Sequence, residues 1–406
     1  MSVVFPESVE LKNLFLVVVA GGQGTRLFPM SHDLCPKQFC MLDSKQTFIQ
    51  ATVRRFVDLG VKASRVVVVT TNANQTKLAN EQLSSLGVLV QNVYEIKPHF
   101  DYAGAMVKAA QFIYDKFNKD AVVINTPADQ YVVSDEKFSA AVVSTVKSAQ
   151  AGYPTLIGVK ITDPNLMVGC GHVVYDADDD AECKTMLEFV EKPGREKADY
   201  LMREDVSVCN TGINAWPVKR FLDMTAGVRM SNGLKTDVLM RLLSDVRVVI
   251  GGFDWYDCGT LKSLYDISDK TPNHKNASLG QGEIHRHNCR GSLFVSIRHV
   301  EIHAAGAENV AVVVNEVNGR MVIVVVNLDD SQKVRDLADD YQKYKAFLTD
   351  DFSVGARNNR VSTTRVSEDI RVGFVGVRDY TITAVKYDDG RFVVIVSNDS
   401  VQAIVA

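Results

Sequence analysis

Short apolar runs alternate with longer segments of helical spacing over the first 150 residues. The runs are rich in valine and isoleucine, which predicts buried strands at 14–20, 65–70, 88–94 and 121–125. The segments between them repeat apolar residues every three to four positions, which predicts helices at 47–59, 75–86 and 102–117. This alternation predicts an α/β fold with a mostly parallel, Rossmann-like sheet that is flanked by helices on both faces.

The pattern changes along the rest of the chain. It first becomes mixed, with strands expected at 154–161, 172–175, 185–191 and 207–216, and helices near 195–204, 217–225 and 234–244. Beyond residue 280 short valine runs dominate, at 293–297, 310–314, 321–326, 372–377 and 392–396, with one helix expected at 332–345. We therefore expect a smaller β-rich C-terminal domain.

Two stretches of this C-terminal part resemble each other. FVSIRHVEIHAA (294–305) and FVGVRDYTITAV (374–385) share their first two residues, an arginine and their alternation, which favours a β-coil or β-helix built from similar units. The polar segment 269–282 predicts the boundary between the domains. We expect domains at 1–268 and 280–406, with 346–406 as an extension of unassigned role.

Composition narrows the class of protein. Of the 406 residues 46% are hydrophobic, and the formal net charge is −4 without a basic block, which argues against a nucleic-acid partner. The seven cysteines are scattered and none forms a Cys-x-x-Cys pair, so we expect reduced thiols. The N-terminus does not resemble a signal peptide, and no apolar run has the length of a membrane span. We expect a soluble, cytoplasmic protein without a membrane partner.

Candidate chemistry begins where the first predicted strand ends. Gly21, Gly22 and Gly24 permit a loop whose amide groups form a cradle for anions, and Arg26 and Lys37 add positive charge. We expect both basic residues on a surface loop that serves phosphate charge rather than packing. The spacing does not fit a P-loop or a dinucleotide-binding fingerprint.

Several motifs resemble one family. AGGQGTRLFPMS (20–31) followed by PKQF (36–39) resembles the signature of the sugar-1-phosphate nucleotidylyltransferases, and Lys-Gln-Phe is most similar to the mannose-1-phosphate guanylyltransferase (GDP-mannose pyrophosphorylase) branch. PADQ (127–130), FVEKPG (189–194), NTGINAW (210–216) and WYDCGT (255–260) resemble further motifs of the family in the expected order. The resemblance covers residues 14–262 and continues loosely to about 345.

The resemblance implies a reaction and a set of site residues. A sugar phosphate oxygen would attack the α-phosphorus of a nucleoside triphosphate and release pyrophosphate, so the small-molecule partners are an NTP and a sugar 1-phosphate. The implied roles are catalysis by Arg26 and Lys37, nucleotide binding by Ala20, Gly21, Gly22, Gly24, Thr25, Glu95 and Asp129, sugar-phosphate binding by Gly171, Glu191, Lys192 and Asn210, and binding of Mg²⁺ by Asp129 and Asp257.

The sequence predicts the reaction more specifically than it predicts the substrates. The family resemblance favours GTP and mannose 1-phosphate, with Glu95 accepting from guanine or fixing the loop beside the base. Departures from the family pattern at 100–102 and 169–174 leave another base, or another hexose or heptose 1-phosphate, open. Tyr102 could instead stack on any base. A non-catalytic regulatory subunit of the same fold is the third alternative.

Three further features receive structural interpretations. His285 and His287 form a His-x-His pair, but alternation along this stretch favours the edge of a β-coil over a metal site. Glu191 and Lys192 could form a surface ion pair, and Trp216 is expected in the core. The valine-rich C-terminal strands make a homodimer possible.

Overall fold

A computed structural model describes residues 5–22, 24–43, 45–96, 102–161, 164–226, 239–241, 243–297, 300–345, 362–367, 370–375, 377, 380–386 and 392–398. The chain divides into two compact units. Unit 1 comprises Met1–Gly21 and Ile49–Trp255, and unit 2 comprises Gly22–Phe48 and Tyr256–Ala406. This division differs from the domains expected at 1–268 and 280–406, because the segment 22–48 packs with the C-terminal part of the chain.

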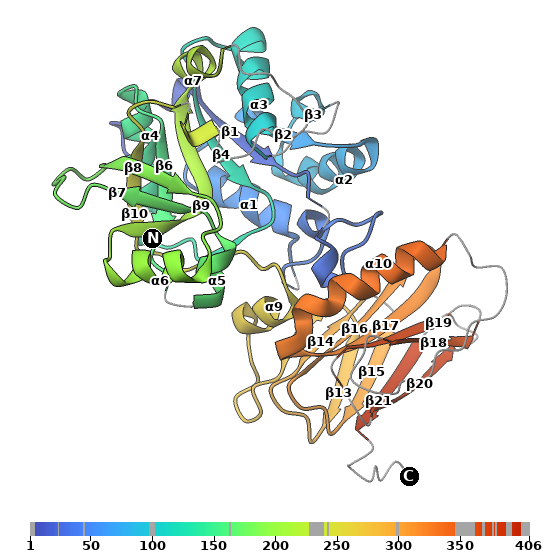
Figure 1. Cartoon of the computed structure of the whole chain (residues 1–406). Helices are drawn as coiled ribbons and strands as arrows, with labels where there is room; N and C mark the ends of the chain where they lie inside the picture. Colours follow the sequence, from blue (N-terminus) through green and yellow to red (C-terminus); the bar gives the residue numbers. More distant parts are fainter. Residues whose placement is uncertain are drawn as a thin grey trace. The chain divides into compact units, whose positions relative to one another are not determined.

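Unit 1 is built on a nine-stranded sheet (Figure 1). The spatial order is β3 (Val93–Glu95), β2 (Val66–Thr70), β1 (Leu14–Val19), β4 (Val122–Pro127), β9 (Ser207–Pro217), β6 (Thr155–Val159), β10 (Arg247–Gly251), β8 (Lys184–Val190) and β7 (His172–Tyr175). β1 pairs in parallel with β2 and β4, and β2 pairs in parallel with β3. β9 runs antiparallel to both of its neighbours, β4 and β6. Because β8 also pairs antiparallel with β10 and with β7, the expected parallel pairing is confirmed for the strands of the first 150 residues, while the sheet as a whole is mixed.

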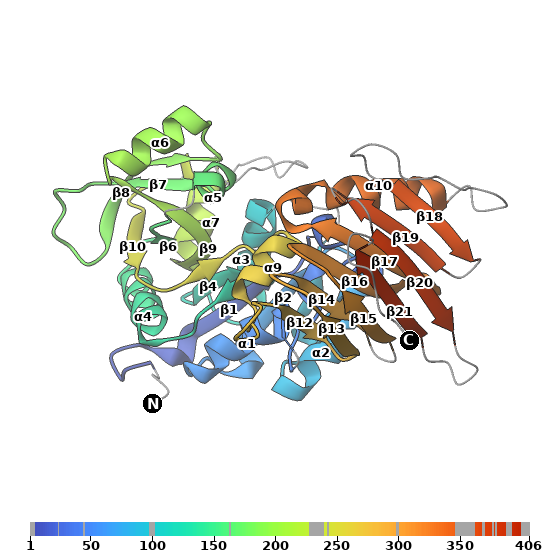
Figure 2. The ribbon, with the colours of Figure 1, turned by 90° about the horizontal axis from the view of Figure 1, so that it is seen from below.

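Helices cover both faces of this sheet. One face carries α1 (Phe48–Asp58), α2 (Ala73–Leu83) and α4 (Glu136–Gln150), as Figure 2 shows. Phe56 of α1 packs edge-on against Phe138 of α4, with ring centroids 5.8 Å apart. The other face carries α3 (Tyr102–Lys116) and α7 (Val218–Thr225), which share a core cluster with β1, β2 and β4. Trp216 is buried in that cluster and stacks on Phe221, so its expected core position is confirmed.

The remaining elements of unit 1 are short. They are β5 (Tyr131–Val132), α5 (Pro164–Gly169) and α6 (Arg195–Arg203), and β11 (Trp255–Tyr256) lies where unit 1 ends in the sequence. The third strand begins at Val93 rather than at residue 88, because residues 90–92 form a 3-10 turn. Most of the helix expected at 234–244 lies outside the described residues, although 239–241 are helical.

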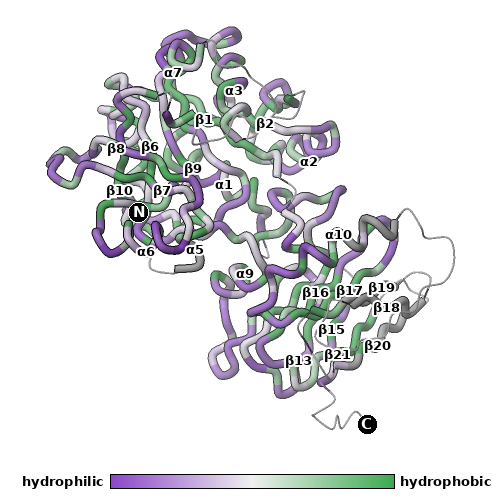
Figure 3. The backbone as a smooth tube through the Cα atoms, in the orientation of Figure 1, coloured by the Kyte–Doolittle hydropathy of each residue, from purple (hydrophilic) through white to green (hydrophobic). Residues whose placement is uncertain are grey.

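Unit 2 contains two sheets, which hold six and four of the described strands. The larger has the order β12 (Ala277–Gly280), β14 (Leu293–Ser296), β16 (Val310–Val317), β17 (Arg320–Asn327), β19 (Ile370–Val375) and β18 (Ser362–Ser367). The smaller has the order β13 (Glu283–His287), β15 (Val300–Ala305), β21 (Phe392–Asn398) and β20 (Tyr380–Lys386). Figure 3 shows hydrophobic strands in this unit, as expected for a core between two sheets.

From β12 to β16 the chain alternates between these sheets, as expected for a β-rich coil. β12, β14 and β16 pair in parallel in one sheet, while β13 and β15 pair in parallel in the other. The two similar stretches occupy equivalent places, since each contributes its first strand (β14 or β19) to the larger sheet and its second (β15 or β20) to the smaller. The extension beyond residue 346 therefore supplies strands to both sheets.

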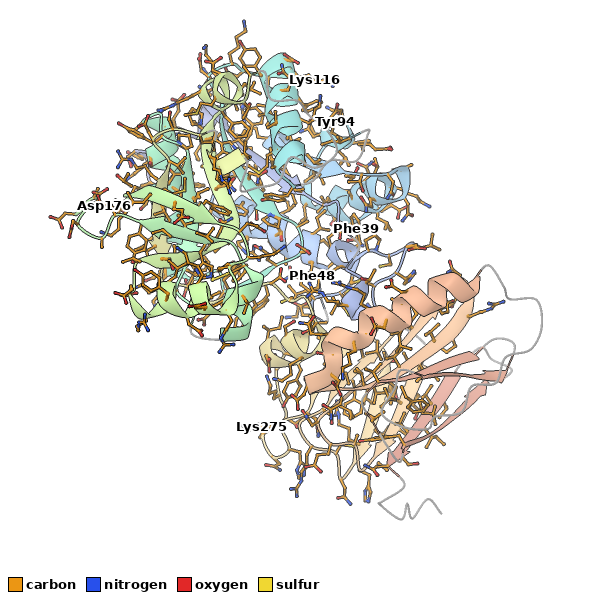
Figure 4. All side chains as sticks on the ribbon, in the orientation of Figure 1. Phe39, Phe48, Tyr94, Lys116, Asp176 and Lys275 are labelled. Carbon is orange, nitrogen blue, oxygen red and sulfur yellow. A yellow bond between two sulfur atoms is a disulfide. The ribbon has the colours of Figure 1, made fainter. Side chains whose placement is uncertain are left out.

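The segment 22–48 belongs to unit 2 through side chains that reach the C-terminal part. Asn315 of β16 donates from Nδ2 to the carbonyl of Pro29 at 2.7 Å, and the ring of Phe28 lies 5.2 Å from that of Tyr341 in α10 (Val334–Lys345). Phe39 and Phe48, both marked in Figure 4, are buried. α9 (Leu261–Ile267) and the 3-10 helix η7 (Leu328–Lys333) complete the unit.

Candidate active site

The glycine loop begins where β1 leaves the sheet of unit 1, beside its parallel neighbours β2 and β4. The amide of Ala20 donates to the carbonyl of Val69 on β2 at 2.8 Å, and the amide of Ala128 donates to the carbonyl of Val19 on β1 at 3.0 Å. Because β1 and β4 are neighbours, Asp129 follows a strand end beside that of the loop. The glycine loop and the PADQ motif (127–130) therefore occupy neighbouring strand ends.

Gly21 is packed closely at this point. A Cβ atom on Gly21 would lie 2.8 Å from Cγ2 of Thr71, closer than real Cβ contacts come. Gly22 is exposed, and a Cβ there would meet no atom within 4 Å. A side chain at position 21 would therefore displace Thr71, while position 22 is open to an approaching ligand.

In unit 2, Gly24 and Lys37 form one packed pair. Gly24 has φ of +70°, a conformation that favours glycine, and precedes the 3-10 helix η2 (Thr25–Leu27). A Cβ on Gly24 would collide with Cβ of Lys37. The glycine loop and the lysine that follows it in the sequence are therefore directly adjacent, as a common phosphate site requires.

Lys37 is buried rather than placed on a surface loop. Only 3% of the residue is exposed, and its ammonium lies 5.5 Å from the centre of the Phe48 ring. Nζ donates a hydrogen bond of 2.5 Å to the carbonyl of Asp257. The expected surface position is wrong for this residue, because its aliphatic stem packs against Gly24 and its charged end is held by protein groups.

Arg26 and Asp257 also lie close together in unit 2. Gly259 separates them, since a Cβ on Gly259 would lie 2.8 Å from Oδ2 of Asp257 and 2.9 Å from Nη2 of Arg26. Nη1 of Arg26 donates to Oε1 of Gln332 in η7 at 3.2 Å. Arg26 is half-buried and Asp257 is exposed. Sequence reasoning missed Gly259 and Gln332, whose importance depends on contacts between distant segments.

A tyrosine-centred network lies behind Asp129 in unit 1. The Tyr102 hydroxyl donates to the carbonyl of Gly212 at 2.7 Å and accepts from Nδ2 of Asn125 at 2.6 Å. Burial raises the pKa of Tyr102; the bond from Asn125 opposes this rise, and the Asp129 charge adds to it. Because its hydroxyl is held by the protein, Tyr102 has a structural role, and this observation disfavours the alternative that it stacks on a base. Phe100 and Asp101 lie outside the described residues.

Gly212 of the NTGINAW motif completes that network. Its φ is +76°, and a Cβ there would lie 2.8 Å from Cγ of Pro127, two residues before Asp129. Glu95 ends β3, pairs in register with Thr70 of β2 and is half-buried, as is Asp129. The polar residues expected at the nucleotide therefore follow, or lie at, the ends of β1, β3 and β4.

Three of the residues expected at the sugar phosphate lie together in unit 1. The amide of Asn210 donates to the carbonyl of Gly171 at 2.8 Å, and a Cβ on Gly171 would lie 3.1 Å from Oε2 of Glu191. Lys192 has φ of +44°, and its Nζ lies 3.5 Å from Oε1 of Glu191. Both side chains are solvent-accessible, so the surface ion pair considered from the sequence is present.

A disulfide joins the segment that precedes β7 to β9 at this place. Cys170 and Cys209, whose Cα atoms are 6.0 Å apart, are bonded, and each immediately precedes an expected sugar-side residue, Gly171 or Asn210. The expectation that all cysteines are reduced is therefore wrong in this structure. The pairing depends on β7 and β9 being neighbours, which spacing in the sequence does not indicate.

His172 is buried next to this disulfide. Its Nε2 donates to the carbonyl of Met167 at 2.9 Å, and its Nδ1 lies 3.3 Å from Oγ of Ser207. Burial lowers the pKa of His172, and the bond to Met167 opposes the shift. A neutral imidazole therefore fills the position after Gly171.

Comparisons with known proteins agree with these features. Residues 16–274 match the family described as Nucleotidyl transferase. The mannose-1-phosphate guanylyltransferase of Sinorhizobium fredii (strain NBRC 101917 / NGR234) is 24% identical over 336 residues, which are 75% of this chain and 64% of that protein. The mannose-1-phosphate guanylyltransferase of Salmonella montevideo is 25% identical over 356 residues, which are 80% of this chain and 73% of that protein. The chain thus spans less than two thirds of the first relative.

One solved structure shares the fold over most of its length. It is described as mannose-1-phosphate geranyltransferase from Thermus thermophilus, with a TM-score of 0.64 and 22% identity, and the match covers 81% of this chain and 99% of that one. Within the described residues, none of the helices has both the length and the apolar character needed to cross a membrane.

Proposed function

Because the chain belongs to the nucleotidyl transferase family, we propose that it transfers a nucleotidyl group from a nucleoside triphosphate to a sugar 1-phosphate. An oxygen of the sugar phosphate forms a bond to the α-phosphorus, the bond from that phosphorus to the α–β bridging oxygen breaks, and pyrophosphate leaves. Such a reaction requires the alignment of two anions and stabilisation of charge, without a covalent enzyme intermediate.

The main support for this proposal is the cluster of Arg26, Lys37 and Asp257 in unit 2. Lys37 presents a charge that cannot move freely, because Asp257 and Phe48 hold its ammonium. Preorganised charge of this kind stabilises a transition state without reorganisation during the reaction. Lys37 would act on the α-phosphate, and the guanidinium of Arg26 on the departing pyrophosphate.

Other residues would hold the rest of the substrates. The amides of Ala20 and Gly21 at the end of β1, and those of Gly22, Gly24 and Thr25 that follow them in the chain, suit the triphosphate. Gly171, Glu191 and Asn210, which lie together, would bind sugar hydroxyls, with Lys192 on the sugar phosphate. These roles rest on the placement of the residues and on their resemblance to the family motifs.

The available carboxylates suit a divalent cation. Asp129 and Asp257 offer hard oxygen ligands. Asp257 is exposed and lies beside the guanidinium of Arg26, to which a phosphate group of the substrate would also bind. Mg²⁺ commonly binds through one or two carboxylates together with substrate phosphates. When bound, the ion would neutralise phosphate charge. We include Mg²⁺ in the proposal, with Asp129 and Asp257 as its candidate ligands.

We propose GTP and mannose 1-phosphate as the substrates. Support comes from the relatives, which are named as mannose-1-phosphate guanylyltransferases, and from Glu95, whose carboxylate can accept from the N1–H and N2–H₂ donors of guanine. Location in the cytoplasm and assembly as a homodimer belong to the same proposal.

The test measures pyrophosphate release with Mg²⁺, each of the four NTPs and a panel of sugar 1-phosphates. Release that requires both substrates, and is fastest with GTP and mannose 1-phosphate, supports the proposal. Preference for another pair would retain the reaction and overturn the substrates. Absence of release with every pair would favour the non-catalytic regulatory subunit.

A further inference from the structure

Two histidines lie side by side on the smaller sheet of unit 2. β13 and β15 pair in parallel, and their register places His285 directly opposite His303. Ile302, between Glu301 and His303, is buried in the core of unit 2. Because side chains alternate along a strand, Glu301, His303 and the register-matched His285 share the opposite, solvent-accessible face of the sheet.

The carboxylate of Glu301 joins the two imidazoles. Its Oε1 lies 3.0 Å from Nε2 of His285 and 2.7 Å from Nε2 of His303. The rings are stacked, with centroids 4.5 Å apart and planes 17° from parallel. One ligand atom from each residue lies within 4.8 Å of the other two, so the three converge on one point.

This arrangement changes the interpretation of the HRH stretch. The sequence suggested His285 and His287 as the pair to consider, and alternation argued against a metal site there. Nε2 of His287 instead lies 3.4 Å from Nδ2 of Asn288. The second imidazole comes from His303 on the next strand, at a position that only the register of the sheet reveals.

The chemistry of these donors selects a class of ion. Two imidazole nitrogens and one carboxylate oxygen suit first-row transition ions such as Zn²⁺, Co²⁺, Ni²⁺ and Cu²⁺ better than Mg²⁺ or Ca²⁺, which prefer ligand sets made of oxygen. About half of each histidine side chain is exposed, so an ion would reach both Nε2 atoms and keep water ligands. Zn–N and Zn–O distances near 2 Å require only small side-chain movements from this geometry.

We propose that His285, Glu301 and His303 form a binding site for a divalent transition metal ion, with Zn²⁺ as the leading ion. The ion would replace the hydrogen-bonded contacts to Glu301 by three coordination bonds and would cross-link β13 to β15. The site shares no residue with the candidate active site. It is also distinct from the Mg²⁺ ligands proposed there.

The test uses the full chain without an affinity tag, treated with a chelator and then dialysed. Calorimetric titration with Zn²⁺ in the absence of a reductant, which keeps Cys170 and Cys209 joined, should give one ion per chain. Removing a metal ligand should weaken binding by about 100-fold or more in H285A and H303A. E301Q retains the size of the side chain and should also weaken binding, because an amide is a poorer ligand than a carboxylate.

H274A is the matched control, since His274 is an exposed histidine of unit 2 outside the cluster, and it should bind Zn²⁺ as the original chain does. Co²⁺ then identifies the ligands, because thiolate ligands add intense near-ultraviolet absorption that imidazole and carboxylate ligands do not. Equal Zn²⁺ affinity in H285A, H303A and H274A, a thiolate spectrum with Co²⁺, or no saturable binding by the original chain would each overturn the proposal.

Discussion

The ammonium of Lys37 donates a 2.5 Å hydrogen bond to the backbone carbonyl of Asp257, across 220 residues of sequence. The bond joins the PKQF and WYDCGT motifs inside unit 2. Lys37 is almost completely buried, so the contact fixes its charge instead of leaving it mobile in solvent. We infer that the backbone of the loop containing Asp257 positions the lysine. The side chain of Asp257 is exposed and remains available to bind a ligand.

Substitution of Gly259 by alanine should impair catalysis more than folding. The added Cβ would lie within 3 Å of both the Asp257 carboxylate and the Arg26 guanidinium, so both side chains must move. We expect kcat to fall by about 10- to 100-fold, since small displacements of catalytic groups have effects of this size. Steady-state kinetics of G259A, compared with its thermal midpoint, measure the two effects separately.

G252A is the control for that substitution, because a Cβ on Gly252 makes only an ordinary contact at 3.7 Å with Lys137. It should retain both activity and stability. Full activity in G259A would show that Arg26 and Asp257 do not need their observed positions.

The sequence predicted the features that depend on nearby residues. The apolar runs at 14–20, 65–70 and 121–125 became β1, β2 and β4, because buried parallel strands need continuous apolar residues. The glycine loop was recognised from its own composition. By contrast, the burial of Lys37 depends on Phe48 and on a carbonyl of a distant loop.

Two other features also lay beyond prediction from sequence. Cys170 meets Cys209, and His285 meets His303, because the register of neighbouring strands brings each pair together. Register follows from the packing of a whole sheet, so it cannot be predicted from the spacing of residues along the chain. The same holds for residues 346–406, whose described strands matched no known motif but complete both sheets of unit 2.

Thiol titration in denaturant should detect five free cysteines rather than seven before reduction, because Cys170 and Cys209 are joined. Loss of a cross-link over 39 residues should lower the free energy of unfolding by about 2–4 kcal/mol.

We expect C170S to raise KM for the sugar 1-phosphate, since the bond ties together the segments of Gly171 and Asn210. C183S serves as the control, as Cys183 is a free thiol. Seven reactive thiols would contradict the disulfide.

Stability should decrease as the pH falls below the ordinary pKa of histidine. Burial lowers the pKa of His172, so between that lowered value and 6.5 the unfolded chain binds a proton that the folded chain does not. This difference makes the free energy of unfolding rise with pH in that interval. The free energy of unfolding, measured with denaturant, should decrease less between about pH 7.5 and about pH 5.5 for H172Q than for the original chain. An equal decrease in both proteins would show that His172 does not contribute to the pH dependence.

Base selectivity should depend on Glu95. A carboxylate that accepts two hydrogen bonds from guanine discriminates strongly against bases that lack those donors, because its oxygens would remain unpaired. We expect E95Q to narrow the preference for GTP over UTP in a competition of four NTPs at equal concentration, with little change in the thermal midpoint. A wild-type preference for UTP, CTP or dTTP would instead show that the guanine assignment is wrong.

The central claim is that Lys37 supplies charge for nucleotidyl transfer. Lys37→Met tests it most directly, because methionine retains the buried stem beside Gly24 and removes the ammonium. Lys262→Met is the control, since it removes a partly exposed charge of unit 2 that is paired with Asp266. Pyrophosphate release with Mg²⁺, GTP and mannose 1-phosphate should fall by about 100- to 1,000-fold in Lys37→Met and remain unchanged in Lys262→Met. Unchanged release by a folded Lys37→Met variant would contradict the account.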